Sequence, residues 1–242
     1  MLKVDTHIHS EHSPDSRMSL AEILDTAKEK GLNAVAICDH EQVFSEEIPR
    51  HPVQVIRGGE FSTEYGHLIG LFLTEEVERG DFQTLCNSIH AQGGIAVLAH
   101  PFQRSVYTAK LPQAAAFIDG VEVWNSRAGR KDRAANQKAY EFAKEQGLLF
   151  FAGSDAHTQE EIGNAYLAVE CDGDLKTALL AGTGRVYGKH SSSVAAAKSG
   201  WIQRRKNKKK NYIGWLAFLL KCLAEDLIRK KEKEYVTYCQ DR

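Results

Sequence analysis

Short apolar runs recur along most of the chain, and the segments between them have helical character. The runs 34–38 and 148–152 each hold five consecutive apolar residues, which is typical of strands buried on both faces of a parallel sheet. In the segment 19–30, Ser19 and Glu22 have the spacing of a helix capping box. This alternation predicts a parallel sheet with helical crossovers. With so many units, and without a GxGxxG or P-loop motif, we expect a closed or nearly closed α/β barrel rather than an open nucleotide-binding sheet.

Charge is distributed unevenly along the 242 residues. Residues 1–197 carry 18 basic and 27 acidic residues, a net charge of −9, whereas residues 198–242 carry 13 and 5, a net charge of +8. We therefore expect one α/β domain over 1–193 and a basic extension over 194–242. The acidic body would repel a free polyanion, so affinity for phosphate would have to come from bound metals and a few local cations.

The cysteines and the chain start bear on the cellular compartment. The five cysteines are scattered, odd in number and form no CxxC motif, which favours a reducing environment over a disulfide framework. No apolar signal segment opens the chain, and no run approaches the ~20 apolar residues that a membrane-spanning helix needs. These features predict a cytoplasmic protein.

Polar residues of metal-ligand type follow the predicted strands. His7 and His9 are two residues apart in the first strand and so point to the same face. Barrel enzymes place their active sites at the carboxyl ends of the strands. A lone histidine or aspartate there has an ordinary structural explanation, but recurrence at equivalent strand ends favours a metal site, and mixed nitrogen and oxygen ligands suit Zn, Mn or Fe. The candidate ligands are His7, His9, His40, Glu60, His100, Asp155 and His157, with Asp15 and His67 able to join them.

Four motifs resemble those of a known family, the PHP (polymerase and histidinol phosphatase) family. They are the segment 5–10 (DTHIHS), Asp39-His40 with Gly59-Glu60, His100-Pro101, and the segment 153–157 (GSDAH). The resemblance runs from residue 2 to about residue 193, with all motifs in order. It implies a distorted (β/α)7 barrel and a nine-ligand site for two or three divalent metal ions.

The resemblance also implies how the nine ligands are shared. His7, His9, Glu60 and Asp155 would hold one metal. Glu60 would bridge to a second metal, held also by His67 and His100, and a third would be held by Asp15, His40 and His157. Asp5 and Asp39 flank ligands, and we expect them to play supporting or structural roles.

The function that follows is hydrolysis of a small phosphomonoester, a metabolite or a nucleotide, by a metal-activated water. Glu60, Asp155 and His157 are the expected catalytic residues, with Asp155 or His157 moving protons. Arg17 and Arg127 are candidates for binding the phosphate, although either is as readily a solvated surface residue.

One alternative function is a metal-binding structural or interaction module without turnover. Another is a hydrolase of an amide-type bond, which the absence of a bridging lysine at a strand end disfavours.

The basic extension combines a Lys/Arg-rich run, 198–210, with an apolar segment, 212–228. We favour a terminal helix over 212–228 that packs on the barrel and keeps its basic face in water, preceded by a disordered basic run. The alternative is that residues 198–233 form a basic amphipathic element at an anionic membrane surface or on nucleic acid. The apolar positions on one face of the helix are 212, 216, 219, 220, 223 and 227.

Overall fold

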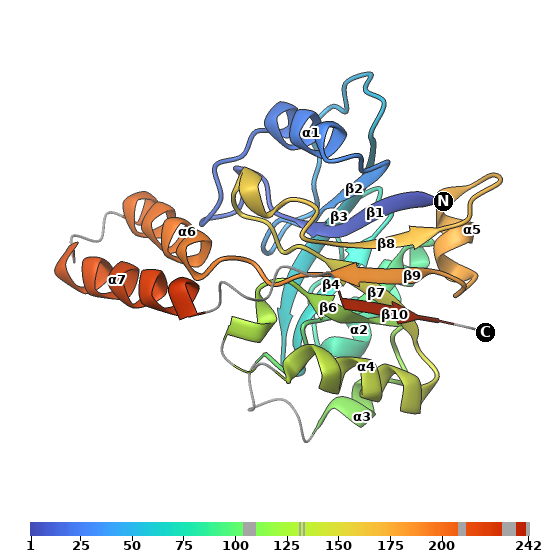
Figure 1. Cartoon of the computed structure of the whole chain (residues 1–242). Helices are drawn as coiled ribbons and strands as arrows, with labels where there is room; N and C mark the ends of the chain where they lie inside the picture. Colours follow the sequence, from blue (N-terminus) through green and yellow to red (C-terminus); the bar gives the residue numbers. More distant parts are fainter. Residues whose placement is uncertain (104–109, 131, 133, 208–211, 229–235, 241–242) are drawn as a thin grey trace.

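A single curled sheet organises the chain, with most helices around it and the last two to one side of it (Figure 1). The computed structural model describes residues 1–103, 110–130, 132, 134–207, 212–228 and 236–240. Ten strands pair in the order β10-β9-β8-β1-β2-β3-β4-β5-β6-β7. Their bounds are β1 Leu2–Ile8, β2 Ala34–Ile37, β3 Gln54–Thr63, β4 Gly66–Leu71, β5 Ile95–Ala99, β6 Gly120–Asn125, β7 Leu149–Gly153, β8 Ala165–Val169, β9 Arg185–Gly188 and β10 Val236–Cys239.

The helices are α1 Leu20–Glu29, α2 Phe82–Ala91, α3 Leu111–Ala114, α4 Ala135–Gln146, α5 Leu175–Leu180, α6 Ser193–Lys206 and α7 Tyr212–Ile228, with short 3-10 turns η2 Ala128–Arg130 and η3 Gln159–Glu161. The capping box that begins α1 is confirmed: the Glu22 amide donates to Ser19 Oγ, and the Ser19 amide donates to Glu22 Oε2. Helix α4 ends at Gly147, whose φ of 66° is left-handed.

The expectation of a wholly parallel sheet is wrong, because the sheet is mixed. The pairs β1–β2, β2–β3, β5–β6 and β6–β7 are parallel, whereas β4, β8, β9 and β10 pair antiparallel to their neighbours. Only Glu64 and Tyr65 separate β3 from β4, and a parallel return needs a crossover of about a dozen residues. The fold is therefore mixed α/β with a curled, half-barrel sheet, and the (β/α)7 count stays a prediction.

Backbone hydrogen bonds draw the end of the sheet back to its middle. The Asp155 amide donates to the His7 carbonyl, and the His9 amide donates to the Ala156 carbonyl, at 2.8 and 2.9 Å. Ile8 and Ala156 form an isolated parallel bridge. The segment after β7 thus lies beside the end of β1, which curls the sheet around its apolar interior.

The extension is more ordered than expected. The basic run is helical as far as Lys206 in α6, so the expectation of disorder is wrong there, while 208–211 lie outside the described residues. Helix α7 packs on α6, with the Trp201 and Trp215 rings 4.5 Å apart and Trp215 Nε1 donating to the Ala197 carbonyl. Strand β10 then rejoins the sheet beside β9. The division of the chain near residue 193 stays a prediction.

The face of α7 expected to pack on the barrel points largely to solvent instead. Leu216, Leu220, Leu223 and Leu227 are between 44 and 67% exposed. The side that meets the rest of the chain carries Trp215 and the buried Cys222. Because α7 is apolar on both sides, periodicity could not indicate which side would be buried. Contact of this helix with a membrane or nucleic acid stays a prediction. Within the described parts of the chain, no helix has the length and apolar character needed to cross a membrane.

Gly153, the last residue of β7, allows the closest approach between β7 and β1. A Cβ there would lie 2.2 Å from His7 Cβ and 2.5 Å from Glu122 Oε1. The variant Gly153→Ala is therefore expected to lower the free energy of unfolding by about 1–3 kcal/mol through overpacking, measured by urea denaturation. Gly173→Ala is the matched control, since nothing lies within 4 Å of a Cβ there. Equal stability of the two variants would contradict this packing.

Candidate metal centre

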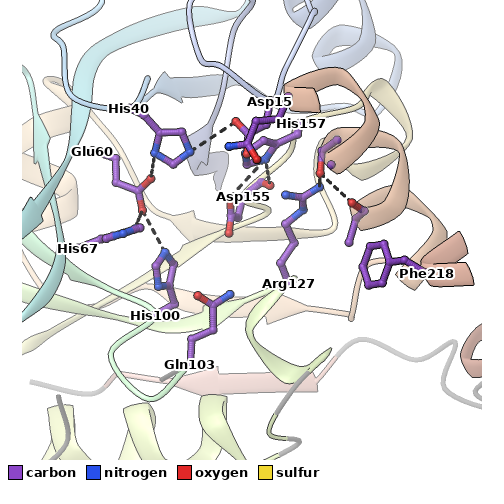
Figure 2. A pocket seen from close by; sticks show the side chains of 14 residues that line it. Asp15, His40, Glu60, His67, His100, Gln103, Arg127, Asp155, His157 and Phe218 are labelled. Carbon is purple, nitrogen blue, oxygen red and sulfur yellow. Dashed lines mark hydrogen bonds and ion pairs between the residues drawn. The ribbon is translucent and has the colours of Figure 1, made fainter. Parts of the chain in front are cut away.

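The fold brings all nine candidate ligands together at one edge of the curled sheet. Most come from the carboxyl end of a strand or from the loop that follows it, as the strand-end pattern predicts, whereas Glu60 lies within β3 and His67 near the start of β4. Their side chains converge on one cavity or on the buried wall behind it (Figure 2). They are His7 of β1, His9 directly after β1, Asp15 before α1, His40 after β2, Glu60 of β3, His67 of β4, His100 after β5, and Asp155 and His157 after β7.

Glu60 lies at the centre of this group, and its two oxygens face different histidines. Oε1 lies 2.7 Å from His67 Nδ1 and 3.0 Å from His100 Nε2. Oε2 lies 2.8 Å from His40 Nδ1 and 3.6 Å from His9 Nε2. One buried carboxylate thus stands between two sets of imidazoles, as a bridging ligand would.

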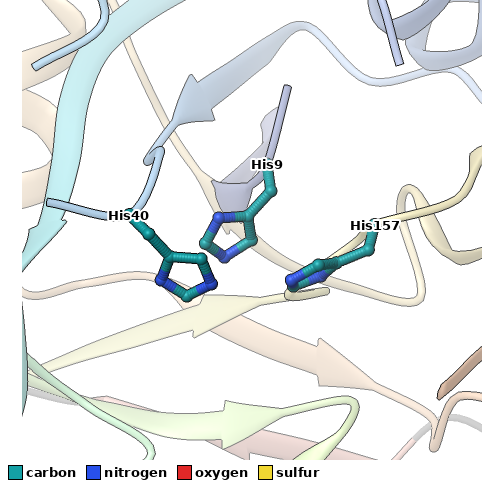
Figure 3. Close-up of side chains that lie close together, drawn as sticks. All are labelled: His9, His40 and His157. Atoms are coloured by element: carbon teal, nitrogen blue, oxygen red, sulfur yellow. The ribbon is translucent and has the colours of Figure 1, made fainter. Parts of the chain in front are cut away.

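The remaining ligands group on either side of His9. His7 Nε2 and His9 Nε2 lie 3.0 Å apart, and Asp155 Oδ1 lies 3.3 Å from His9 Nε2. On the other side, His9, His40 and His157 bring ring nitrogens within 4.8 Å of one another (Figure 3). Asp15 joins them, with Oδ2 3.2 Å from His157 Nε2 and Oδ1 3.6 Å from His40 Nε2. This arrangement accommodates the three proposed groups, and the role of each residue as a ligand stays a prediction.

The unsatisfied oxygens of the cluster fit metal ions. Glu60 Oε2 and Asp15 Oδ1 are buried and accept no hydrogen bond from any described residue; the close contact of Glu60 Oε2 with His40 is an ion pair without hydrogen-bond alignment. Buried polar atoms without partners are rare unless an ion or water completes them. Among the described residues, four overlapping groups of three ligand atoms lie in the cluster, and two of them include Glu60. Their mixture of imidazole and carboxylate suits Zn, Mn or Fe.

The cluster shifts the pKa values of its members in opposite directions. Burial acts to raise the pKa of Glu60, but the charges on His67 and His7 hold it well below its usual range. Burial, together with repulsion by His157 and His40, lowers the pKa of His9 well below its usual range. Burial also opposes the charge on His40, yet Glu60 and Asp15 raise the pKa of His40 to about 9. The carboxylates are thus ionised and ready to bind a cation, while some imidazoles hold protons that a metal would displace.

Glu122 of β6 supports the cluster, and the sequence analysis missed it. Its Oε1 lies 3.0 Å from His7 Nδ1, and its Oε2 accepts a hydrogen bond from the His100 amide at 2.9 Å. Glu122 Oε2 also accepts from Asn125 Nδ2, which in turn donates to Asp155. Such carboxylate–histidine contacts fix the orientation and tautomer of a ligand ring. The available signal was a single acidic residue inside an otherwise apolar buried strand.

Asp39 and Asp5 hold the loops that carry ligands. Asp39 Oδ1 accepts from the Ser10 amide at 2.8 Å and from Ser13 Oγ at 2.6 Å, and Ser13 Oγ also contacts His9 Nδ1. Asp5 Oδ1 accepts from the Ser154 amide at 2.9 Å, next to the ligand Asp155. These contacts agree with the supporting roles expected for both residues.

Two of the candidate ligands have left-handed backbones. His100 has a φ of 30° and Asp155 a φ of 53°. Such conformations cost a non-glycine residue about 1–3 kcal/mol and are found mainly at functional sites. The Glu122 carboxylate holds the His100 amide, and the His7 carbonyl holds the Asp155 amide. The fold thus maintains an unfavourable backbone where the side chains must meet.

The two candidate phosphate-binding arginines differ in position. Arg127 lines the cavity, is 13% exposed, and donates from Nε to Glu161 Oε1 at 2.8 Å and from Nη2 to Ser199 Oγ at 3.0 Å. Arg17 is exposed and is not among the residues that line the cavity. The structure thus brings Arg127, but not Arg17, to the cavity that the candidate ligands line.

The cavity over the cluster has a volume of about 370 Å³. The curled sheet supplies one side of it. Helices α6 and α7 supply part of the other side, α6 through Ser199 and Gln203 and α7 through Phe218 (Figure 2). The extension that follows residue 193 therefore forms part of the wall of the site.

Comparisons of sequence identify relatives of the chain. A family model described as PHP-associated matches residues 133–183. An uncharacterised protein of Methanocaldococcus jannaschii is 34% identical over 174 residues, which cover 69% of this chain and 70% of that protein. A probable phosphatase of Vibrio campbellii is 28% identical over 210 residues, covering 70% of this chain and 83% of the phosphatase.

Solved structures share the fold. A two-domain protein of Bacteroides vulgatus containing a predicted PHP-like metal-dependent phosphoesterase superposes with a TM-score of 0.60 at 18% identity, over 83% of this chain and 69% of that chain. A lesion-specific endonuclease Q of Pyrococcus furiosus superposes with a TM-score of 0.52 at 18% identity, over 71% of this chain and 53% of that chain. Sequence relatives, shared fold and a converged set of histidines and carboxylates agree. The chain therefore belongs to the PHP family of metal-dependent phosphoesterases.

Proposed function

We propose that this protein hydrolyses a small phosphomonoester, a metabolite or a nucleotide, with two or three divalent ions of Zn, Mn or Fe. The observation that carries the proposal is the position of Glu60, whose two oxygens lie between separate groups of imidazoles. A carboxylate so placed can bind two cations at once. The completeness of the ligand set favours an enzyme over a non-catalytic metal-binding module.

When bound, the metal ions would lower the pKa of a water molecule and neutralise phosphoryl oxygens. The nine converging ligands would hold them, with Glu122 keeping His7 and the His100 backbone in place. Arg127 would donate hydrogen bonds to the phosphate, in an orientation maintained by Glu161. Asp155 or His157, at the edge of the cavity, would hold and release protons.

The cavity and the charge of the chain support a small substrate. A volume of about 370 Å³ lies toward the lower end of the range of pockets that bind small molecules. The acidic body disfavours a long polyanion.

A nucleic-acid substrate is the second candidate, because endonuclease Q, in complex with a 27-mer duplex substrate with an abasic lesion, shares the fold. Among the described residues no lysine lines the cavity, which disfavours the amide-hydrolase alternative.

We include a cytoplasmic location in the proposal because the five cysteines are scattered and form no CxxC motif, which favours a reducing compartment.

The direct test is phosphate release from an aryl phosphate, phosphorylated metabolites and short oligonucleotides, with Mn²⁺ or Zn²⁺ added. We expect metal-dependent turnover of a monoester. Glu60→Gln should lower that activity by at least about 100-fold, because a neutral amide cannot bridge two cations. Glu170→Gln, at an exposed ion pair with the amino terminus, should leave it unchanged. Cleavage of oligonucleotides alone would replace the monoester with a nucleic-acid substrate, and full activity of Glu60→Gln would refute the site.

Glu122 offers a second test, which separates support from direct ligation. Glu122→Gln keeps the size of the side chain but removes the charge beside His7 Nδ1. We expect metal affinity to fall about 10–100-fold, the range found for groups that orient a ligating histidine. Competition with a chromogenic chelator measures this affinity. Activity should return at high metal concentration, and a variant that stays inactive when saturated with metal would show that Glu122 does more than orient His7.

Metal affinity should also depend on pH. The pKa of His40 is raised to about 9 in the metal-free cluster, so at pH 7 its ring carries a proton that must leave before the nitrogen can bind a cation. The apparent affinity should therefore rise with pH from about 7 to 9 and level off above that range. Isothermal titration in two buffers of different ionisation enthalpy measures the released protons. Binding without proton release would contradict this assignment.

A further inference from the structure

Lys206, the last residue of α6, attaches this helix to the loop between β1 and α1. Its Nζ donates hydrogen bonds to the backbone carbonyls of Glu11, Ser13 and Ser16, at 2.8, 2.7 and 2.9 Å. An ammonium group has three hydrogen-bond donors, and Lys206 uses all three on carbonyls of one short loop. The contact joins segments 190 or more residues apart in the chain.

The loop held by Lys206 carries the candidate ligand Asp15. Asp15 lies between Ser13 and Ser16, two of the three residues that Lys206 binds. The Asp15 carboxylate meets His157 and His40, which are candidate ligands of the same metal group, so outside that group its position depends on the path of the loop backbone. On its inner side the loop is held by Ser16 Oγ, which donates to the His9 carbonyl, and by Ser13 Oγ, which donates to Asp39. Lys206 holds it from the outer side.

Helix α6 is itself fixed at several points, which allows it to act as a support. Asp226 of α7 accepts hydrogen bonds from the Ser193 and Val194 amides at its amino end. At its middle, Ser199 accepts a hydrogen bond from Arg127. The helix therefore runs along the cavity from Arg127 to the loop that carries Asp15.

We propose that Lys206 is a positioning residue for Asp15, and that α6 thereby completes the third metal group, formed by Asp15, His40 and His157. The inference rests on the proposed metal-dependent function, because it takes Asp15 as a ligand. The ligands of the other two groups lie on strands or within two residues of a strand end. His9 touches the loop through Ser13 and Ser16, but its own amide is held by the Ala156 carbonyl, so these ligands depend less on the Lys206 contact than Asp15 does. Loss of the Lys206 contact frees the loop, and ordering Asp15 on a metal then costs more conformational entropy.

The test compares metal binding by the full-length wild type and Lys206→Met. Methionine keeps most of the length of the side chain and removes the three donors. We expect the most weakly held ion to bind at least about 10-fold more weakly, as for other groups that support a ligand, while the remaining ions bind as before. The readouts are metal content per chain by mass spectrometry and stepwise affinities by competition with a chelator. The melting temperature of the metal-free protein should stay close to that of the wild type.

Three further variants separate positioning from a general effect on the helix. Lys198→Met removes the same charge from the same helix, but Lys198 pairs with the exposed Glu160, so metal binding should be unchanged. Lys206→Arg, which keeps charge and donors, should recover part of the affinity. Asp15→Asn should lose the same ion as Lys206→Met.

The inference is overturned if Lys206→Met binds metals like the wild type, if Lys198→Met loses as much affinity, or if Asp15→Asn loses no ion. None of these results would affect the proposed activity, which the wild type and Glu60→Gln test. Conversely, a wild type that binds metals but releases no phosphate would refute the activity and leave the role of Lys206 measurable.

Discussion

The hydrogen bonds between the end of β1 and the segment after β7 hold the site together. The Asp155 amide donates to the His7 carbonyl, and the His9 amide donates to the Ala156 carbonyl. Together they place two pairs of candidate ligands side by side, one from β7 at the end of the sheet and one from β1 in its middle. Because Gly153 has no side chain, the two backbones can approach closely enough to form these bonds. If the sheet did not curl at this point, the ligands would remain spread along an open edge.

This arrangement places many ionisable groups in a region with little solvent, which is costly without compensation. The protein meets the cost mainly by mutual pairing, with Glu60 among the imidazoles and Glu122 beside His7. Asp15 Oδ1 still accepts no hydrogen bond from any described residue. The candidate ligands His100 and Asp155 also keep left-handed backbones, which cost conformational energy. A site that is strained and partly unsatisfied without metal can gain free energy when it binds one. Such a gain would couple metal binding to the stability of the fold.

The candidate ligands that converge in the structure could be picked out from the sequence, and their role as ligands stays a prediction, but the residues that support them could not be picked out. His7, His9 and His40 follow a regular pattern, in which residues of ligand type occur where apolar strands end. Glu122 and Lys206 have no such pattern, since a buried acid in a strand and a lysine in a basic run each have ordinary explanations. What distinguishes them is a partner more than 100 residues away in the sequence.

The sequence by itself determined the alternation of apolar strands and helices up to about residue 181 and the identity of the candidate ligands, because both depend on local periodicity and on residue type at strand ends. It did not predict α6, β9 or β10. Only the tertiary structure decided that the sheet is mixed, that it curls until β7 meets β1, and which side of α7 is buried. These outcomes depend on how distant segments pack, and α7, which is apolar on both sides, carries no local signal for the choice. The same holds for the role of α6 as a wall of the site, because that role depends on hydrogen bonds between Lys206 and a loop at the other end of the chain.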